Sequence, residues 1–463
     1  MRVYVAALMV NSICHRTPGL FYYLKYVFLP LSLVLFFQTD AVADTASFLG
    51  LSSRASSMAG AMTAISDDYT AAYYNPSGLN NVLKKDEWLQ VGIGAMYVMP
   101  DFKISDSTGK VKKNDENVKA ITAGLVMDLG RLERHMHGFN LGISFFMPTQ
   151  AIIDVDTPES AREYFFPVYN DISRGMASYA GLSKNIGDKF SIGIGANVLL
   201  RLTDTDTHMA VKIDANEILD NIHDIKKLID ELQIDVSNSA NIRPAVNREL
   251  ILNLAAHAGV TYNPADWLSL GLSFRDKINS DSTGYQYLYI LPIDQNGNVD
   301  VALANKLPVI KVPVEINLFF SPREYTLGIG LKGSMITAAL DLTYSEWSGY
   351  KGPHIETPQP GFKDTFNPKL GIELAASDKI KLRAGYMYRP TPAPEQNSIY
   401  NYLDGDTHIF TTGAGYSFGD STIDAHVQYH YMPDGEVSKD ITGIIVKYGG
   451  SLLSAGVTYN VRF

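Results

Sequence analysis

The C-terminal stretch Leu453–Phe463 reads LSAGVTYNVRF and alternates strictly between apolar and polar side chains. Successive side chains of a β-strand point to opposite faces, so this period of two predicts a strand with one apolar and one polar face. The apolar set is Leu453, Ala455, Val457, Tyr459, Val461 and Phe463; the polar set is Ser454, Gly456, Thr458, Asn460 and Arg462.

The same division recurs upstream in four stretches: Phe190–Arg201, Leu268–Arg275, Ile336–Ser345 and Ile380–Tyr388. Their polar faces carry charged residues such as Asp341. A charge costs little on a face that lines a watery lumen and much in the dry core of a soluble sandwich. We therefore predict an all-β fold, a transmembrane antiparallel β-barrel of about fourteen strands.

The connections between the predicted strands alternate in length, and Thr203–Glu249 and Asn279–Val312 are two of the long ones. Short periplasmic turns and long extracellular loops are typical of outer-membrane barrels, and an even strand number leaves both ends in the periplasm. The expected strands begin near Glu87, Val118, Gly138, Ala177, Phe190, Ile251, Leu268, Val314, Ile336, Lys369, Ile380, His408, Thr422 and Leu452.

The composition agrees with this fold and argues against other classes. Of 463 residues, 27 are Tyr and 37 are Gly. A transmembrane helix needs about twenty consecutive apolar residues, and only the N-terminus comes near that. The net charge of −10 argues against nucleic-acid binding, which needs a basic face. No motif predicts a cofactor or a metal.

The N-terminal residues predict a secretory signal. Tyr26–Phe37 reads YVFLPLSLVLFF, with Lys25 before it and the A-x-A site Ala41–Ala43 after it. We expect residues 1–43 to be cleaved off before Asp44. Cys14 would be lost with them, so the mature chain would rely on no disulfide.

Residues 44–85 differ from the predicted barrel at residues 86–463. Their central part, Met58–Leu79, reads MAGAMTAISDDYTAAYYNPSGL, which is rich in small residues and has neither strand alternation nor a helical apolar stripe. A compact polar segment of this kind can fill the wet interior of a large barrel. We predict that residues 44–85 form an N-terminal hatch that plugs the lumen.

One long loop contains a predicted amphipathic helix, Asn216–Val236, with Ile218, Ile222, Ile225 and Ile229 at helical spacing. Its apolar face must cover something. It is either a lid packed on its own loop or part of a landing groove for an apolar ligand, and the sequence leaves both open.

Four cationic residues on polar strand faces are predicted to point into the lumen: Arg201, Arg275, Lys381 and Arg383. One interpretation pairs them with Asp341, Glu373 or the acids of the hatch. The other is that they bind the carboxylate of a fatty acid, because a charge-assisted hydrogen bond would fix the head group.

The chain resembles the FadL/TodX family of long-chain fatty acid and hydrocarbon transporters. The resemblance rests on the small-residue run of the hatch, the acidic pair Asp67–Asp68 and the turn Asn75–Gly78, with Asn75, Pro76, Ser77 and Gly78. Ser77 departs from the alanine usual in the family. Later stretches with a similar order and spacing are Asp341–Tyr350, Asn367–Pro394 and Gly405–Tyr429.

The resemblance implies capture of a hydrophobic ligand at the extracellular loops, passage to an apolar pocket closed by the hatch, and lateral exit through a kink in the third strand. Here that strand would be Gly138–Ala151, where Gly142 and Pro148 are the residues able to interrupt its ladder. The implied protein is a monomer without a cofactor. Its partners would be hydrophobic small molecules, outer-membrane lipid and the barrel assembly machinery.

Two alternatives belong to other classes. A general porin for small polar solutes would need an open channel. An outer-membrane lipase or deacylase would need Ser, His and an acid together in space, but the sequence has no G-x-S-x-G motif and its histidines are scattered.

Overall fold

The protein is described here from a computed structural model. The model describes residues 46–114, 116–149, 166, 169, 176–204, 206–214, 235–237, 248–294, 298–304, 309–352, 357–397, 402–440 and 442–463. Every structural statement below applies to these residues.

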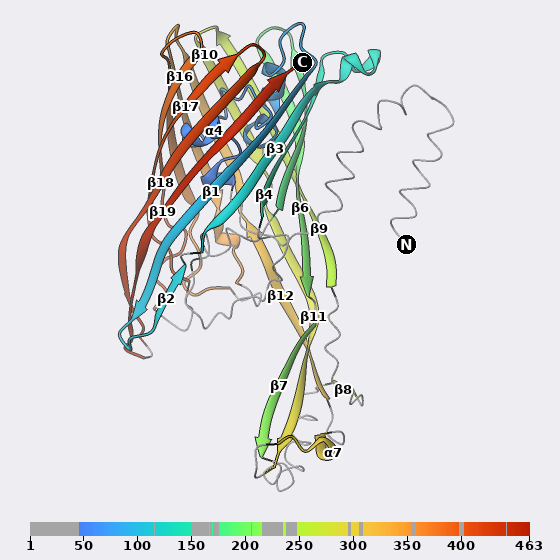
Figure 1. Cartoon of the computed structure of the whole chain (residues 1–463), viewed down its shortest axis with the longest axis vertical. Coiled ribbons are helices and arrows are strands. Elements are labelled where there is room, and N and C mark those ends of the chain that lie inside the picture. Colours follow the sequence, from blue (N-terminus) through green and yellow to red (C-terminus); the bar gives the residue numbers. More distant parts are fainter. Residues whose placement is uncertain are drawn as a thin grey trace, which may run out of the picture.

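Fourteen antiparallel strands close into a barrel (Figure 1). In ring order they are β1 (Leu89–Asp106), β3 (Val118–Asp128), β4 (Phe139–Pro148), β5 (Met176–Ile186), β6 (Phe190–Asp204), β9 (Arg248–Ala265), β10 (Leu268–Arg275), β13 (Arg323–Lys332), β14 (Ile336–Glu346), β15 (Thr365–Ala375), β16 (Ile380–Arg389), β17 (Thr407–Phe418), β18 (Ser421–Ser438) and β19 (Ile445–Arg462).

The barrel closes where β19 pairs with β1, in register from Gln90↔Arg462 to Asp106↔Val446. A short strand, β2 (Val111–Asn114), folds back on β1 at the long-loop end. Lipid-facing positions carry large apolar side chains such as Ile93, Ile194 and Leu340, all exposed in the isolated chain. The predicted all-β barrel is confirmed.

The eighth barrel strand differs from the prediction. The stretch around Val314 belongs to β12 (Val309–Ser321), which pairs with β11 (Ile278–Ile293) outside the barrel, and β13 takes the eighth place. Alternation along a sequence predicts a strand, but it does not specify which sheet the strand joins.

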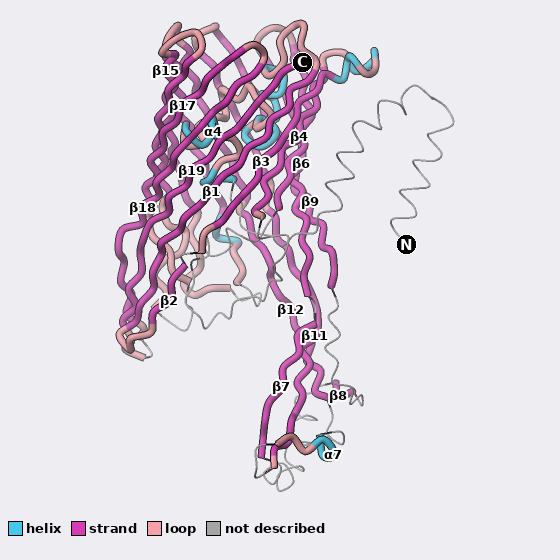
Figure 2. Tube along the Cα trace, in the orientation of Figure 1, coloured by secondary structure: helices cyan, strands magenta, loops and turns pink. Residues whose placement is uncertain are grey.

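Two of the connections predicted as long loops, Thr203–Glu249 and Asn279–Val312, also contain strands. β7 (Asp206–Asp214) pairs in parallel with β11, and β8 (Asp235–Ser237) pairs with β12. Together the four strands form a second sheet that projects beyond the long-loop end of the barrel (Figures 1 and 2). A short helix, α7 (Val301–Ala304), lies in the β11–β12 connection.

Ala46–Leu83, which we call the lumenal segment, lies inside the barrel (Figure 1). Almost all of its residues are buried. It turns through α3 (Ala46–Leu49), α4 (Ser53–Ser57), α5 (Ala71–Tyr74) and the 3₁₀ helix η1 (Pro76–Asn81). None of these exceeds six residues, in keeping with the absence of a helical stripe in its sequence.

Three further 3₁₀ turns lie in connections: η2 (Leu129–Arg131), η3 (Arg134–Met136) and η5 (Trp347–Gly349). The helices among the described residues are all too short or too polar to cross a bilayer.

Candidate functional site

Asn75 anchors the lumenal segment to the barrel wall. Its Oδ1 accepts hydrogen bonds from the Ser77 amide (3.1 Å) and the Ser77 hydroxyl (2.7 Å), which fixes the turn into η1. Its Nδ2 donates to the Thr63 carbonyl (2.8 Å) and to Thr261 Oγ1 on β9 (3.3 Å). Thr261 Oγ1 also lies 2.7 Å from Ser77 Oγ. One buried amide thus joins two parts of the segment to β9.

Glycines of the wall make room for the segment. A Cβ atom built on Gly193 of β6 would overlap the backbone at Pro76, and one on Gly259 of β9 would overlap Asn75. At Gly92 of β1 the same atom would strike the Tyr69 ring. These glycines lie on the polar, inward faces of strands that the sequence predicts. The sequence does not indicate that the lumenal segment fills the space left by their missing side chains.

Gly78 has the same role inside the segment. A Cβ atom there would lie 2.8 Å from the Ser66 carbonyl oxygen. The predicted turn residues Asn75, Pro76, Ser77 and Gly78 are all buried, and they lie in one hydrogen-bonded and closely packed unit.

A charged network joins the segment to β15, β16 and β18 at the short-turn end. Arg54 of α4 binds Asp67 and lies 3.4 Å from Glu373 Oε2. Arg383 contacts Glu373 and Asp424 at 2.6 Å each, and Lys381 contacts Glu373 at 2.8 Å. The predicted cations Lys381 and Arg383 are therefore bound to carboxylates.

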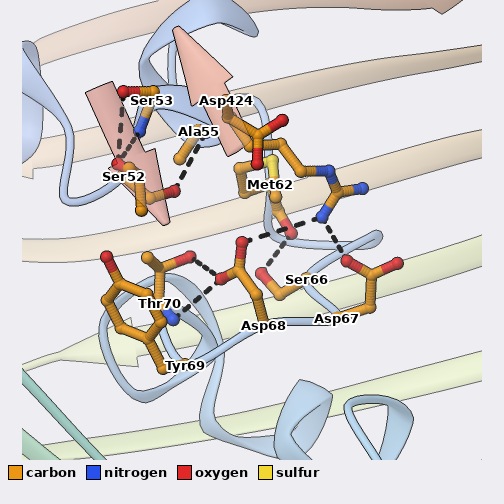
Figure 3. Close-up of polar contacts among 12 residues, drawn as sticks. Ser52, Ser53, Ala55, Met62, Ser66, Asp67, Asp68, Tyr69, Thr70 and Asp424 are labelled. Carbon is orange, nitrogen blue, oxygen red and sulfur yellow. Dashed lines mark hydrogen bonds and ion pairs between the residues drawn. The ribbon is translucent and has the colours of Figure 1, made fainter. Parts of the chain in front are cut away.

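The two acids of the segment, Asp67 and Asp68, differ in burial and in hydrogen-bond partners. Asp68 is buried and accepts hydrogen bonds from the amide and hydroxyl of Thr70, whereas the Asp67 side chain is 47% exposed (Figure 3). Both acids line a pocket of about 130 Å³ together with Arg383 and Arg462. Polar and charged groups therefore line this end of the lumen.

A second carboxylate of the wall holds the segment. The Asp341 Oδ2 atom on β14 accepts hydrogen bonds from the amides of Met62 and Thr63, both at 3.0 Å. The sequence marked Asp341 as a lumenal acid that pairs with a cation. The cation that the structure places near Asp341 is Lys369, opposite it in the β14–β15 ladder. The contacts with the backbone amides of the segment have no sequence signature.

The opposite half of the lumen is apolar. Phe48 and Leu51 of the segment belong to one buried cluster with inward-facing residues of several strands. We call this set the apolar cluster; its barrel members include Val98, Phe102, Ile104, Phe146, Ile409, Met432, Val437, Val446 and Leu452. The inward-facing residues Val98, Phe102 and Ile104 of β1, and Val446 and Leu452 of β19, thus make this part of the lumen apolar.

Two aromatic residues of the β4–β5 connection occupy the apolar cluster. The Phe166 ring lies 5.4 Å from Phe102, and the Tyr169 ring lies 4.6 Å from Phe102 and 5.3 Å from Phe48. Both side chains are fully buried. The sequence did not predict that Phe166 and Tyr169 lie in the lumen, because a single aromatic residue in a long connection has no periodic pattern that indicates its contacts.

Arg275, another predicted cation, does not belong to the charged network of Arg54, Glu373 and Arg383. Arg275 binds Glu324 and stacks on the Tyr73 ring at 4.0 Å. Arg201 is in β6, but its side chain lies outside the described residues. The predicted helix with Ile218, Ile222, Ile225 and Ile229 also lies outside them.

Gly142 and Pro148 are both in β4. The pairing of β4 with β3 and with β5 continues through Gly142 without a register shift. Because Gly142 has no side chain, Leu79 of the segment fits against it. Pairing of β4 with β5 stops at Phe146, whereas pairing with β3 continues to Pro148.

Within the described ranges, no three His, Cys, Asp or Glu side chains come together in a way that would hold a metal ion.

A closed antiparallel barrel with an apolar outer band is the architecture of an integral outer-membrane protein. A family model for "Outer membrane protein transport protein (OMPP1/FadL/TodX)" matches residues 35–463. The chain belongs to this family, whose members are transporters rather than enzymes. Its location is the outer membrane.

Solved structures of similar fold include the Pseudomonas putida toluene transporter TodX, with a TM-score of 0.55 and 18% identity over 88% of this chain and 97% of TodX. A Pseudomonas aeruginosa FadL homologue matches with a TM-score of 0.52 and 16% identity, covering 92% of this chain and 98% of the homologue. The Ralstonia pickettii toluene transporter TbuX matches with the same score and identity, covering 90% of this chain and 99% of TbuX. No curated protein sequence matches the chain.

Proposed function

We propose that the protein takes up hydrophobic molecules, hydrocarbons or long-chain fatty acids, by passive diffusion through a lumen that the lumenal segment closes as a hatch. The apolar cluster is the observation that carries this proposal. A porin for polar solutes needs a wet lumen, but here inward-facing side chains such as Val98, Phe102 and Met432 are apolar and belong to one buried cluster with Phe48.

The proposed path runs from the long loops into the apolar cluster. An apolar ligand would take the place of Phe166 and Tyr169 and replace ring contacts with contacts of its own. The predicted capture face of Ile218, Ile222, Ile225 and Ile229 would lie upstream of this step and remains a prediction.

Lateral exit through β4 is the proposed next step. The short-turn end of the lumen is lined by charges such as Arg54, Glu373 and Arg383, and moving an apolar molecule from an apolar into such a polar region raises its free energy. The contact of Leu79 with Gly142 links the hatch to β4, so hatch movement would free the inner surface of that strand. Release into lipid then avoids the charged end.

The test compares uptake with conductance. Cells that express the full chain should accumulate radiolabelled naphthalene faster than cells with an empty vector, and uptake of a labelled disaccharide should not change. In planar bilayers the purified protein should carry little steady current. A large steady current with disaccharide uptake would establish a porin instead, and equal naphthalene uptake in both cell lines would refute the proposal.

A further inference from the structure

We infer that the transported ligand is uncharged, and that the lumen discriminates against carboxylates. This inference rests on the proposed function and narrows its substrate class to hydrocarbons and other neutral apolar molecules. The observations that carry it are the partners of the lumenal cations and the charge of the pocket among the long loops.

Three arginines whose side chains the structure describes in the lumen are each paired with a carboxylate of the chain. Arg54 binds Asp67, Arg275 binds Glu324, and Arg383 lies between Glu373 and Asp424. A fatty-acid carboxylate could bind one of them only by displacing a protein carboxylate that is held in place. Burying a carboxylate without a free cation is strongly unfavourable.

Arg389 is the arginine that borders the apolar cluster. Its guanidinium lies 5.2 Å from the centre of the Tyr169 ring, and Tyr169 packs on Phe48 and Phe102. It would be the natural partner of a carboxylate whose chain lies in the cluster.

Asp404 occupies that position instead. Its two oxygens accept hydrogen bonds from Arg389 Nη1 (2.9 Å) and Nη2 (2.7 Å), a bidentate pair. Nη2 also donates to Thr407 Oγ1 at 3.0 Å, and Thr391 Oγ1 donates to Asp404 at 3.0 Å. The Asp404 side chain is 0% exposed. The charge of Arg389 is therefore balanced within the wall.

The pocket next to this pair is acidic. It has a volume of about 440 Å³ and lies among the β14–β15 and β16–β17 connections and the long-loop ends of β18 and β19. Besides Asp404, whose charge Arg389 balances, its charged lining residues are the carboxylates Glu395, Asp406 and Asp434 and the ammonium group of Lys363. Like charges at an entrance lower the local concentration and the association rate of an anion.

The buried Lys439 does not reverse this balance. Its ammonium donates to the Gln396 carbonyl in the β16–β17 connection, and burial lowers its pKa to about 8. The Lys439 ammonium is held at the Gln396 carbonyl, and Lys439 is not among the lining residues of the pocket.

The experiment uses two matched pairs of labelled probes at neutral pH: naphthalene with 2-naphthoate, and dodecan-1-ol with dodecanoate. We expect the full chain to raise uptake of the neutral member of each pair over the vector control and to leave the carboxylate unchanged. Uptake of the carboxylates equal to or above that of the neutral probes would overturn the inference while leaving the proposed function intact. Uptake of neither member would refute the proposed function itself, and the inference with it.

Asp404→Asn tests the assignment to the buried pair, because it frees the charge of Arg389 with little change of shape. We expect the variant to gain carboxylate uptake by about tenfold, the ratio that one charge-assisted hydrogen bond contributes, with neutral uptake retained. Heat-modifiable migration on gels confirms that the barrel has folded. A folded variant that still excludes both carboxylates would overturn the role of Arg389 and Asp404.

Glu395→Lys tests the entrance without disturbing a buried group, since Glu395 is exposed. We expect carboxylate uptake to rise by about threefold and to fall again with added salt. Glu133→Lys is the matched control, because it makes the same change of charge on an exposed residue in a turn at the short-turn end. Equal responses of the two variants would rule out an electrostatic filter at the loop pocket.

Discussion

At the scale of single residues, the lumenal segment is held by a few buried polar atoms and by missing side chains. Asn75 joins Thr63, Ser77 and Thr261, and Gly259 leaves the space that the amide occupies. A buried polar group that loses its partner costs more than the hydrogen bond itself contributed. The packing of the segment should therefore be sensitive to single substitutions in this turn.

Asn75→Ala should weaken the attachment of the segment by about 1–3 kcal/mol, because it removes the hydrogen bonds that Asn75 makes with the Ser77 amide and the Thr63 carbonyl. Limited proteolysis of the detergent-solubilised protein should cut within residues 46–83 faster than in the unchanged chain.

Ser77→Ala is the matched control in the same turn. It removes one hydroxyl but leaves the Asn75 contacts to Thr63 and to the residue 77 amide, so its effect should stay below about 1 kcal/mol. Equal proteolysis rates for the two variants would contradict the anchoring role of Asn75.

At the scale of elements, different interactions stabilise the lumenal segment and the strands. The strands form a continuous hydrogen-bonded ring from β1 to β19, which satisfies their backbone groups within the bilayer. The segment has helices of no more than six residues, too short to be stable alone. Its conformation therefore depends on the barrel, whereas the ring of strands does not need the segment for its backbone pairing.

Deleting residues 44–79 from the mature chain should leave a folded barrel that leaks. The ring of ladders stays complete, and removal of the segment opens the polar half of the lumen. We expect a large rise in steady conductance and in passage of small polar solutes, measured in planar bilayers. A folded deletion variant with unchanged conductance would show that the segment does not block the lumen.

At the scale of the whole molecule, the barrel and the projecting sheet share no strand, so the hydrogen-bonded ring does not include the projecting sheet. β10 pairs directly with β13 from Leu268↔Leu331 to Arg275↔Glu324. The ring is therefore closed without β11 and β12, which leave it at its long-loop end. The ion pair of Arg323 with Asp276 (2.8 Å) lies at this junction. The projecting sheet adds length at the long-loop end but no strand to the ring.

Replacing residues 278–321 by a short turn should therefore preserve the barrel. We expect heat-modifiable migration like that of the full chain and unchanged uptake of naphthalene, because the apolar cluster draws on none of the removed residues. Failure of the shortened chain to fold would mean that barrel assembly depends on β11 and β12.

The amino-acid sequence determined the class of the fold. Strict alternation, as in Leu453–Phe463, requires a strand with two unlike faces, and charges such as Arg383 on the inner face require a lumen. These are local properties that each strand carries by itself, so strand positions such as Phe190, Leu268 and Ile380 could be predicted directly.

Only the tertiary structure decided which partners meet across the lumen. The alternation at Val309–Ser321 could not reveal that this strand leaves the ring. The charges of Arg389 and Asp404 are separated by a connection whose course no periodicity encodes, and Gly193 could not be paired with Pro76 from its sequence. Such contacts depend on how the closed ring and the segment fit together in three dimensions, and that fit has no local sequence pattern.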